Sequence, residues 1–247
     1  MNPIVQVISD NPVLSKGLID MLPELGLTQE AFTFKCSKGS ESMMSEGLGF
    51  EVDSIKVKEE WEAVLADFNL VISLHCKQLF PKELVEGVRC VNVHPGLNPY
   101  NRGWFPQVFA IMNGMPHGAT IHEIDAELDH GPIIAQEEVS IHSDDTSLDV
   151  YNRVQEAELR LMKANLRAIL DHSYSTTNPE VEGNLNMIKD YRALLELDPN
   201  ENLTMGEAIN RLRALTHGDY RNAYFIDPTT GDKIYVTIDL HRESDAE

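Results

Sequence analysis

The stretch of this 247-residue sequence with the clearest chemical character is CVNVHPGLNPYNRGWFPQVF, at residues 90–109. Its apolar run carries Asn92 and His94 and then breaks at Pro95 and Gly96. Residues two apart on a strand point to the same side, so Asn92 and His94 can face one ligand together. An amide and an imidazole at a strand end can serve catalysis or only close the strand with hydrogen bonds, and both alternatives stay open.

A second polar stretch, HGATIHEIDAELDHGPIIAQEEV at residues 117–139, places Asp129 in a turn between two apolar runs. Gly131 and Pro132 force a sharp change of direction directly after it. Acyl transfer to an amine needs a proton acceptor, donors for the oxyanion and a carboxylate that orients the base. Asp129, together with the amide and the imidazole of the first stretch, supplies these side-chain types.

Two other chemistries fit these residues less well. His122 opens half of an H-E-x-x-H zinc motif, but Ala126 stands where the second histidine would be, so no metal is expected. His122 and His130 are interpreted as a strand residue and a loop residue. The sequence has no G-x-S-x-G nucleophile elbow, and Cys76 beside Lys77 is the one thiol that stays a candidate nucleophile. Direct transfer is therefore favoured over a covalent enzyme intermediate.

The elements that position these residues follow from the apolar pattern. Short apolar runs alternate with helical stretches, which predicts a Rossmann-like, mostly parallel α/β sheet flanked by helices. Strands are expected at residues 4–8, 32–36, 52–57, 70–74, 90–93, 119–124 and 133–139. No G-x-G-x-x-G follows the first run, so a dinucleotide-binding dehydrogenase is disfavoured.

The C-terminal third has a different pattern. Residues 146–170 carry apolar side chains at helical spacing and predict a long amphipathic helix, while residues 172–184 predict a loop. Thr204 and Glu207 form a capping box ahead of a short helix. Apolar runs at 223–226 and 234–240 flank the turn sequence DPTTGD and predict a β-hairpin.

This pattern predicts two regions of unequal size. Residues 1–178 are expected to form the catalytic domain, and residues 179–247 a small C-terminal region of helix and hairpin. About 70 residues with so few core positions are not expected to be stable alone. The region should therefore pack on the first domain or on a second copy, which favours a homodimer.

Composition excludes several classes of partner. The chain has 40 acidic and 20 basic residues, for a formal net charge of −20, whereas nucleic-acid binding relies on Lys and Arg. No apolar stretch approaches the roughly 18 residues of a membrane span, and the N-terminus lacks the pattern of a signal peptide. Three cysteines without paired or metal-ligand spacing indicate reduced thiols. A cytoplasmic protein with no membrane or nucleic-acid partner is expected.

Three motifs of the sequence together carry a family resemblance. N-x-H-P-x-L-x-P, then R-G, and about 35 residues after the histidine D-x-G-P-I-I-x-Q, together resemble the folate-dependent formyltransferases. The resemblance implies the formyltransferase fold, N10-formyltetrahydrofolate as co-substrate, no metal, and Asn92, His94 and Asp129 as the catalytic trio. The family usually has Leu where this chain has Asn98, a departure that suggests a distinct branch.

Further segments narrow the branch. LVISLHCKQLFP, GATIHEIDAELDHGPIIAQ and RLRALTHGDYRNAYF are similar to sugar-nucleotide N-formyltransferases that act on dTDP-4-amino-4,6-dideoxyglucose. The residues implied to contact the formyl-folate are Gln78, Leu79, Phe80, Ile124, Asp125 and Asp129. Those implied to contact the dTDP-amino sugar are Lys77, Arg102, Trp104, Tyr220 and Tyr224.

The resemblance also implies a product, an N-formylated sugar for a surface polysaccharide such as the O-antigen of lipopolysaccharide. Other acceptors stay open: a 3-amino-3,6-dideoxy sugar nucleotide, a galacto epimer, glycinamide ribonucleotide or an aminoacyl-tRNA, the last disfavoured by the negative charge. A non-enzymatic nucleotide-sugar binding module is the alternative of a different class, and folate-dependent turnover would separate it from an enzyme.

Overall fold

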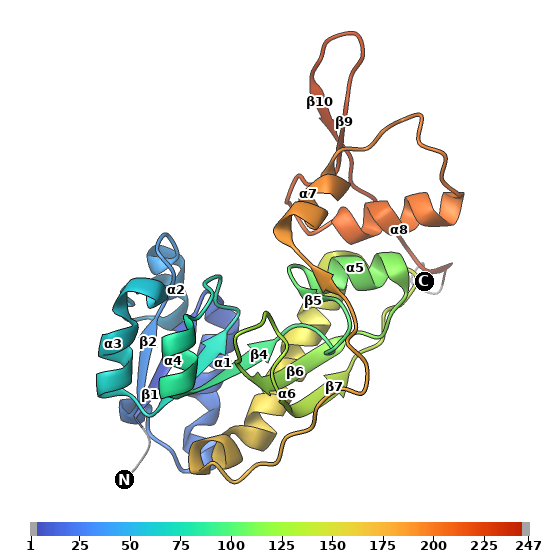
Figure 1. Ribbon diagram of the computed structural model, residues 1–247. Helices are drawn as coiled ribbons and strands as arrows, with labels where there is room; N and C mark the ends of the chain where they lie inside the picture. The colour runs from blue at the N-terminus through green and yellow to red at the C-terminus, as the bar shows by residue number, and fades with distance from the viewer. Residues whose placement is uncertain (1–3, 244–247) are drawn as a thin grey trace.

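The structure is a computed structural model that describes residues 4–243, so the outer ends of the two expected regions lie outside the described residues (Figure 1). Its centre is a six-stranded sheet in the order β2-β1-β3-β4-β6-β7. These strands are β1 (Val5–Ser9), β2 (Phe32–Lys35), β3 (Leu70–Leu74), β4 (Arg89–His94), β6 (Gly118–Glu123) and β7 (Ile133–Glu138). The first four in the sheet order run parallel, and β6 and β7 each run antiparallel to the preceding neighbour. The mostly parallel α/β fold is thereby confirmed.

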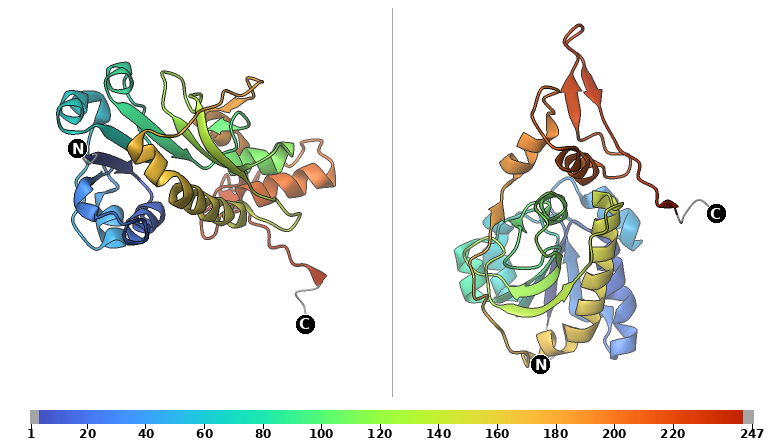
Figure 2. Two further views of the ribbon diagram at one scale, coloured as in Figure 1. Left: turned by 90° about the horizontal axis from the view of Figure 1, so that it is seen from below. Right: turned by 90° about the vertical axis from the view of Figure 1, so that its right-hand side faces the viewer.

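Helices cover both faces of the sheet (Figure 2). One face carries α1 (Pro12–Met21) and the long α6 (Ser147–Asp171), and α2 (Glu41–Leu48) packs on α1. The other face carries α3 (Val57–Asp67) and α4 (Lys82–Gly87). Each face has its own buried apolar cluster, because strands such as β3 are buried along their whole length. The cluster under α1 and α6 is the larger one.

The prediction of a strand at residues 52–57 is wrong. Only Ser54 forms a bridge there, with Cys36, and Val57 already begins α3. Its apolar residues Val52, Ile55 and Val57 are buried in the two clusters, but their spacing of three and then two does not alternate as in a strand. The segment therefore anchors a crossover to the core without pairing along its length.

The remaining elements lie beyond the sheet. They are the 3-10 turns η1 (Pro23–Leu25) and η2 (Gln29–Ala31), α5 (Pro106–Asn113), the strand pair β5 (Arg102–Gly103) and β8 (Leu185–Asn186), α7 (Ile188–Leu195), α8 (Met205–Leu215), and the hairpin β9 (Tyr224–Ile226) and β10 (Lys233–Tyr235). Thr204 caps α8 as the capping box predicts. The hairpin is present, but its second strand ends at Tyr235, short of the expected residue 240.

The C-terminal part is joined to the larger core. Helix α8 packs on α5, and Ala214, Leu215 and Ala223 are buried in the α1/α6 cluster. The hairpin projects away from the body of the molecule (Figure 1). The domain boundary between residues 178 and 179 stays a prediction. Backbone hydrogen bonds join the chain to the first domain on both sides of this boundary, from Thr177 to Ile133 and from Asn184 to Pro99. Among residues 4–243, no helix has the length and apolar character that crossing a bilayer requires.

Candidate active site

Asn92, His94 and Asp129 meet at the carboxyl end of β4. Asp129 Oδ1 accepts a hydrogen bond from Asn92 Nδ2 at 3.1 Å, and Oδ2 accepts one from the Gly103 amide at 3.1 Å. His94 Nδ1 lies 3.5 Å from Asp129 Oδ2. The turn after β6 holds Asp129 in a left-handed conformation, with φ 49°, and Asn98 Nδ2 donates to its carbonyl at 2.8 Å. The sequence-predicted trio is therefore one contiguous cluster.

His94 is held as a neutral imidazole. It is 4% exposed, and burial lowers its pKa to about 4, although the Asp129 carboxylate opposes this. Its Nε2 has no hydrogen-bond partner among residues 4–243. A Cβ on Gly96 would lie 2.4 Å from that nitrogen, so only glycine lets the ring occupy this place. The His94 ring thus keeps one buried nitrogen that no protein group uses among residues 4–243.

Asp129 is ionised across the neutral range. Burial alone would raise its pKa, but His94, His122 and the Gly103 amide together lower it to about 2. Attraction to His94, together with hydrogen bonds to the charged form, thus outweighs desolvation. The site combines a fixed carboxylate with an uncharged imidazole.

His122 is a site residue that the sequence interpretation misses. It is a strand residue as expected, but it lies directly opposite Asn92 in the β4/β6 register. Its Nδ1 donates to the Glu123 carbonyl at 2.7 Å, so its Nε2 is the acceptor for Asn92 Nδ2 at 3.2 Å. His122 Nε2 also lies 3.5 Å from Asp129 Oδ1. His122 therefore fixes which way the Asn92 amide points.

Asn98 and its neighbours secure the turn after β4. Thr120 Oγ1 donates to the Gly96 carbonyl at 2.7 Å and accepts from the Asn98 amide at 3.1 Å. Gln136 Nε2 donates to the Asn98 carbonyl at 2.7 Å. The polar residue that replaces the usual Leu thus uses its side chain on Asp129, which links the two halves of the motif.

The residues expected to bind the formyl-folate lie on the α3/α4 side of the sheet. Phe80 and Ile124 pack against the apolar cluster there, and Leu79 is 72% exposed. Gln78 turns inward instead, because its side chain bonds the Val57 amide at 3.0 Å and the Ile55 carbonyl at 3.0 Å. Asp125 accepts from His130 Nδ1 at 3.0 Å.

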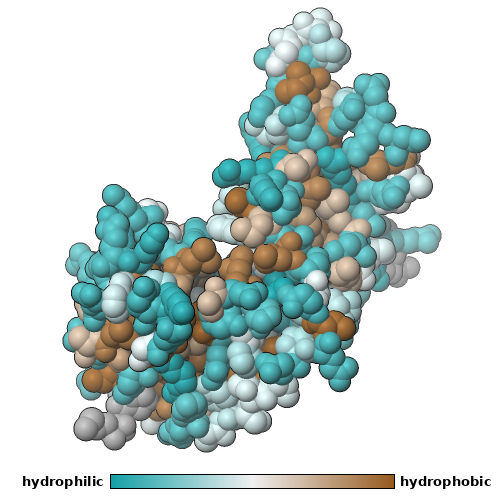
Figure 3. Space-filling model, in the orientation of Figure 1, coloured by the Kyte–Doolittle hydropathy of each residue, from teal (hydrophilic) through white to brown (hydrophobic). Residues whose placement is uncertain are grey.

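The surface of the molecule has a hollow between its two parts. Figure 3 shows apolar side chains in the hollow between the sheet and the C-terminal part, flanked by polar side chains on both sides. An apolar hollow with a few polar groups at its end is the usual form of a small-molecule site.

The residues expected to bind the sugar nucleotide are more scattered. Arg102 is buried and its Nη2 pairs with Glu182 at 2.6 Å. Lys77 is exposed, with its backbone amide on Asp10 at 2.9 Å, and Trp104 packs beside Phe105.

The two tyrosines expected at the base have different surroundings. Tyr220 is 69% exposed and contacts the His217 ring. Tyr224 lies in β9, where its hydroxyl donates to Glu196 at 3.2 Å and the Lys233 ammonium covers its ring. The structure therefore brings Tyr220, not Tyr224, to an open position.

The segment predicted as a loop, residues 172–184, forms one wall of the site. Together with Arg102, Asp129 and His130, residues 178–182 line a cavity of about 310 Å³. Asn101, with no exposed surface, holds this wall by accepting from the Asn113 and Asn184 side chains, each at 2.8 Å. The sequence signal was the cluster of asparagines, which is typical of loops that are fixed by side-chain hydrogen bonds.

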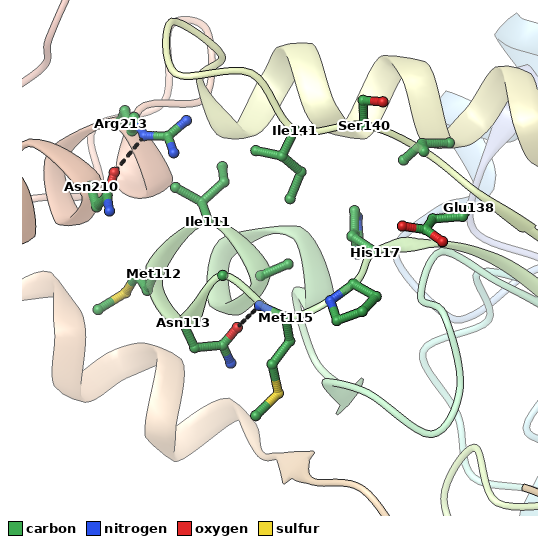
Figure 4. Close-up of a pocket in the computed structure, with 14 residues that line it drawn as sticks. Ile111, Met112, Asn113, Met115, His117, Glu138, Ser140, Ile141, Asn210 and Arg213 are labelled. Carbon is green, nitrogen blue, oxygen red and sulfur yellow. Dashed lines mark hydrogen bonds between the residues drawn. The ribbon is translucent and has the colours of Figure 1, made fainter.

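A separate cavity of about 660 Å³ lies between α5, the end of β7 and α8 (Figure 4). His117, Asn210 and Arg213 are among its lining residues, whereas Asn92, His94 and Asp129 are not. Burial lowers the pKa of His117 to about 3, and neither ring nitrogen has a partner in the described part of the chain. Two clusters that could ligate a metal, Glu127/His130/Glu182 and His142/Asp144/Asp145, also exclude the trio.

Comparison with known proteins gives the site a context. Residues 42–166 match the formyl transferase family, and residues 190–242 match the N-formyltransferase dimerization C-terminal domain. A dTDP-4-amino-4,6-dideoxyglucose formyltransferase from Mycobacterium tuberculosis is 54% identical over 191 residues, which is 77% of this chain and 81% of the relative. A 4-N formyltransferase structure from Francisella tularensis superimposes with a TM-score of 0.90 at 41% identity, covering 97% of this chain and 98% of that one. A sugar N-formyltransferase from a Shewanella species gives 0.89 at 40% identity, covering 96% and 98%.

Proposed function

This chain belongs to the formyl transferase family, and we propose that it transfers a formyl group from N10-formyltetrahydrofolate to the C4 amino group of dTDP-4-amino-4,6-dideoxyglucose. The observation that carries the proposal is the cluster of Asn92, His94 and Asp129, joined by contacts of 3.1 and 3.5 Å. The acceptor is inferred from the relative of 54% identity that bears this activity in its name.

The reaction is a direct acyl transfer. The amine nitrogen of the sugar attacks the formyl carbon, the bond from that carbon to folate N10 breaks, and the proton lost by the amine ends on N10. The formyl oxygen gains negative charge in between, so it needs donors that are already in place. We assign the Asn92 amide to this oxygen, together with the His94 imidazolium once His94 has taken the amine proton. To bond the oxygen, Asn92 Nδ2 gives up one of its present acceptors, His122 or Asp129.

The proton path uses the fixed charge of Asp129. His94 is neutral because burial lowers its pKa to about 4, so its one spare nitrogen carries no proton and can take one. An ionised carboxylate 3.5 Å away stabilises the imidazolium that results. Asp129 therefore orients and stabilises His94 while the proton passes to N10.

The two substrates approach from different faces of the sheet in this proposal. Leu79, Phe80 and Ile124 offer apolar contacts for the folate on the α3/α4 side. Arg102 is the buried cation beside Asp129, and a diphosphate would compete with Glu182 for it. Tyr220 is open to stack on a base.

We also propose that the chain is a homodimer formed through residues 190–242. These residues match a dimerization domain. Their hairpin leaves Ile226, Ile234 and Tyr235 38%, 41% and 44% exposed, and Met205 on α8 is 75% exposed. Apolar surface of this kind on a projecting hairpin is typical of a covered interface. Light scattering tests the proposal, and a monomer at micromolar concentration would overturn it.

The experiment that tests the function is absorbance-monitored release of tetrahydrofolate with a panel of acceptors. The panel contains dTDP-4-amino-4,6-dideoxyglucose, its 3-amino isomer, its galacto epimer, glycinamide ribonucleotide and a control without acceptor. Turnover with the 4-amino sugar at a kcat/KM at least about tenfold above every other acceptor is expected. A higher kcat/KM with another acceptor would reject the proposed sugar, and no turnover with any would reject the enzyme.

A further inference from the structure

A second imidazole–carboxylate pair lies beside the catalytic one. His75 follows β3 directly, and because Leu74 of β3 pairs with Val93 of β4, His75 lies next to His94 at the sheet edge. His75 Nε2 is 2.7 Å from Oε1 of Glu158, a carboxylate on α6 with no exposed surface. The other oxygen of Glu158 has no partner among residues 4–243. A buried carboxylate with one partner costs stability, so its presence needs a reason.

The hydrogen-bond directions around His75 follow from its neighbours. Asn11 Oδ1 accepts from the Leu14 amide, so the Asn11 NH₂ group faces His75 Nδ1 at 3.0 Å. Since Nδ1 must then accept, the Nε2–H donates to Glu158. The Tyr151 hydroxyl lies 3.2 Å from the same Nδ1.

The hydroxyl proton of Tyr151 is used in a hydrogen bond within the protein. Burial, followed by the nearby Glu158 carboxylate, raises the pKa of Tyr151 to about 12, so the hydroxyl keeps its proton. The Tyr151 oxygen accepts a hydrogen bond from Asn11 Nδ2 at 3.1 Å, its own proton faces His75 Nδ1, and Tyr151 is only partly buried. The second lone pair of the Tyr151 oxygen is left as a hydrogen-bond acceptor of fixed orientation.

The location points to the acceptor substrate. Tyr151 and Glu158 come from α6, on the face opposite the α3/α4 cluster that holds Phe80 and Ile124. From Tyr151 a row of rings leads to the C-terminal loop: Tyr151 to His217 is 5.6 Å between centroids, and His217 to Tyr220 is 5.8 Å. The row thus connects the neighbourhood of His94 with the exposed tyrosine proposed for the base.

We propose that the Tyr151 hydroxyl, oriented by His75 and Glu158, accepts a hydrogen bond from a sugar hydroxyl of the bound acceptor and so selects the hexose. The inference rests on the proposed function, because it assumes a sugar nucleotide at this edge of the sheet. Tyr151 is a specificity-determining residue, and His75 and Glu158 are positioning residues that act through it. A site that is built to bond a hydroxyl discriminates strongly against an analogue that lacks it.

The test is a comparison of Tyr151→Phe with the wild type on parent, 2-deoxy and 3-deoxy forms of dTDP-4-amino-4,6-dideoxyglucose. Titration calorimetry is expected to show that Tyr151→Phe raises the Kd of the parent sugar nucleotide about tenfold. One deoxy form should bind the wild type about tenfold more weakly, yet bind Tyr151→Phe within about twofold of the parent. The acceptor KM should follow the Kd, with kcat and the KM of formyl-folate unchanged.

Two further variants separate positioning from mere structure. Glu158→Gln should raise the acceptor Kd about threefold without lowering the Tm, because it removes a buried charge. Tyr191→Phe is the matched control, since the Tyr191 ring packs on Phe105 and its hydroxyl has no partner in residues 4–243; its acceptor Kd should stay unchanged.

The outcomes distinguish this inference from the proposed function. An unchanged Kd in Tyr151→Phe, or an equal loss on both deoxy forms in wild type and variant, would overturn the inference while formyl transfer stands. Tight, hydroxyl-dependent binding without formyl transfer would support the inference and reject the function. Absence of sugar-nucleotide binding by the wild type would overturn both.

Discussion

The two imidazole–carboxylate pairs at the ends of β3 and β4 use the same groups in opposite ways. In the His94–Asp129 pair, the carboxylate also has Asn92 and the Gly103 amide as donors, and the imidazole keeps one nitrogen without a partner. In the His75–Glu158 pair, the imidazole has partners on both nitrogens, and the carboxylate depends on it alone.

This difference shows in the direction of the carboxylate pKa. The pKa of Asp129 is lowered to about 2 in spite of burial, whereas burial raises the pKa of Glu158 despite the contact with His75. Asp129 keeps its bonds to Asn92 and Gly103 while His94 gains or loses a proton. Both nitrogens of His75 have partners, so its ring has a fixed orientation. The first arrangement suits chemistry and the second suits positioning.

The largest expected effect is on the first pair. His94→Ala should lower kcat about 1,000-fold, because it removes both the proton acceptor and one donor to the formyl oxygen. Calorimetry with the sugar nucleotide should show a Kd within about threefold of the wild type. His172→Ala, which removes an exposed imidazole directly after α6, is the control. A kcat within tenfold of the wild type for His94→Ala would contradict the assignment of the chemistry to the His94–Asp129 pair.

The next effect concerns the space around His94. Gly96→Ala places a Cβ at 2.4 Å from Nε2 and should displace the ring, lowering kcat about 100-fold. Gly206→Ala is the matched substitution, because its Cβ meets nothing within 4 Å. Steady-state rates and Tm values of both variants are the measurement. Equal rates in the two variants would mean that the position of the His94 ring is unimportant.

A smaller effect on kcat is expected from His122, which contacts Asn92 and Asp129. His122→Phe removes the acceptor that orients the Asn92 amide at 3.2 Å, and kcat should fall about tenfold with both KM values unchanged. A rise in the acceptor KM with an unchanged kcat would instead assign His122 to ground-state binding.

The smallest effect is on the pH dependence of stability. Burial lowers the pKa of His117 to about 3, so between about pH 6.5 and pH 3 the unfolded chain binds a proton that the folded chain does not. Stability therefore falls as the pH falls through this window, by about 1.4 kcal/mol per unit for one such group. Urea titrations of His117→Leu at pH 6 and pH 5 should show a shallower loss than the wild type. Parallel losses would contradict a buried neutral imidazole at this position.

The sequence predicted the elements with strong local signals. Residues 70–74 form β3 as expected, and the α6 helix and the cap at Thr204 follow from periodicity and a capping box. The prediction of a strand at residues 52–57 was wrong, because apolar composition does not distinguish a strand from a crossover segment whose side chains are buried in the core.

The roles of His122 and Tyr151 could not be predicted from local pattern. His122 enters the site only through the antiparallel register that sets it opposite Asn92, and register between strands thirty residues apart depends on the whole sheet. Tyr151 reaches His75 across 76 positions of sequence. Both are tertiary relationships, whereas Asn92 and His94 share one strand.

The most direct test of the central claim is transfer of an isotopically labelled formyl group from N10-formyltetrahydrofolate, followed by NMR of the sugar nucleotide. Wild-type protein is expected to place the label on the C4 nitrogen of dTDP-4-amino-4,6-dideoxyglucose. Asp129→Asn should bind the sugar nucleotide but form the labelled product about 1,000 times more slowly. Label at another position, or equal rates in the two proteins, would contradict the account.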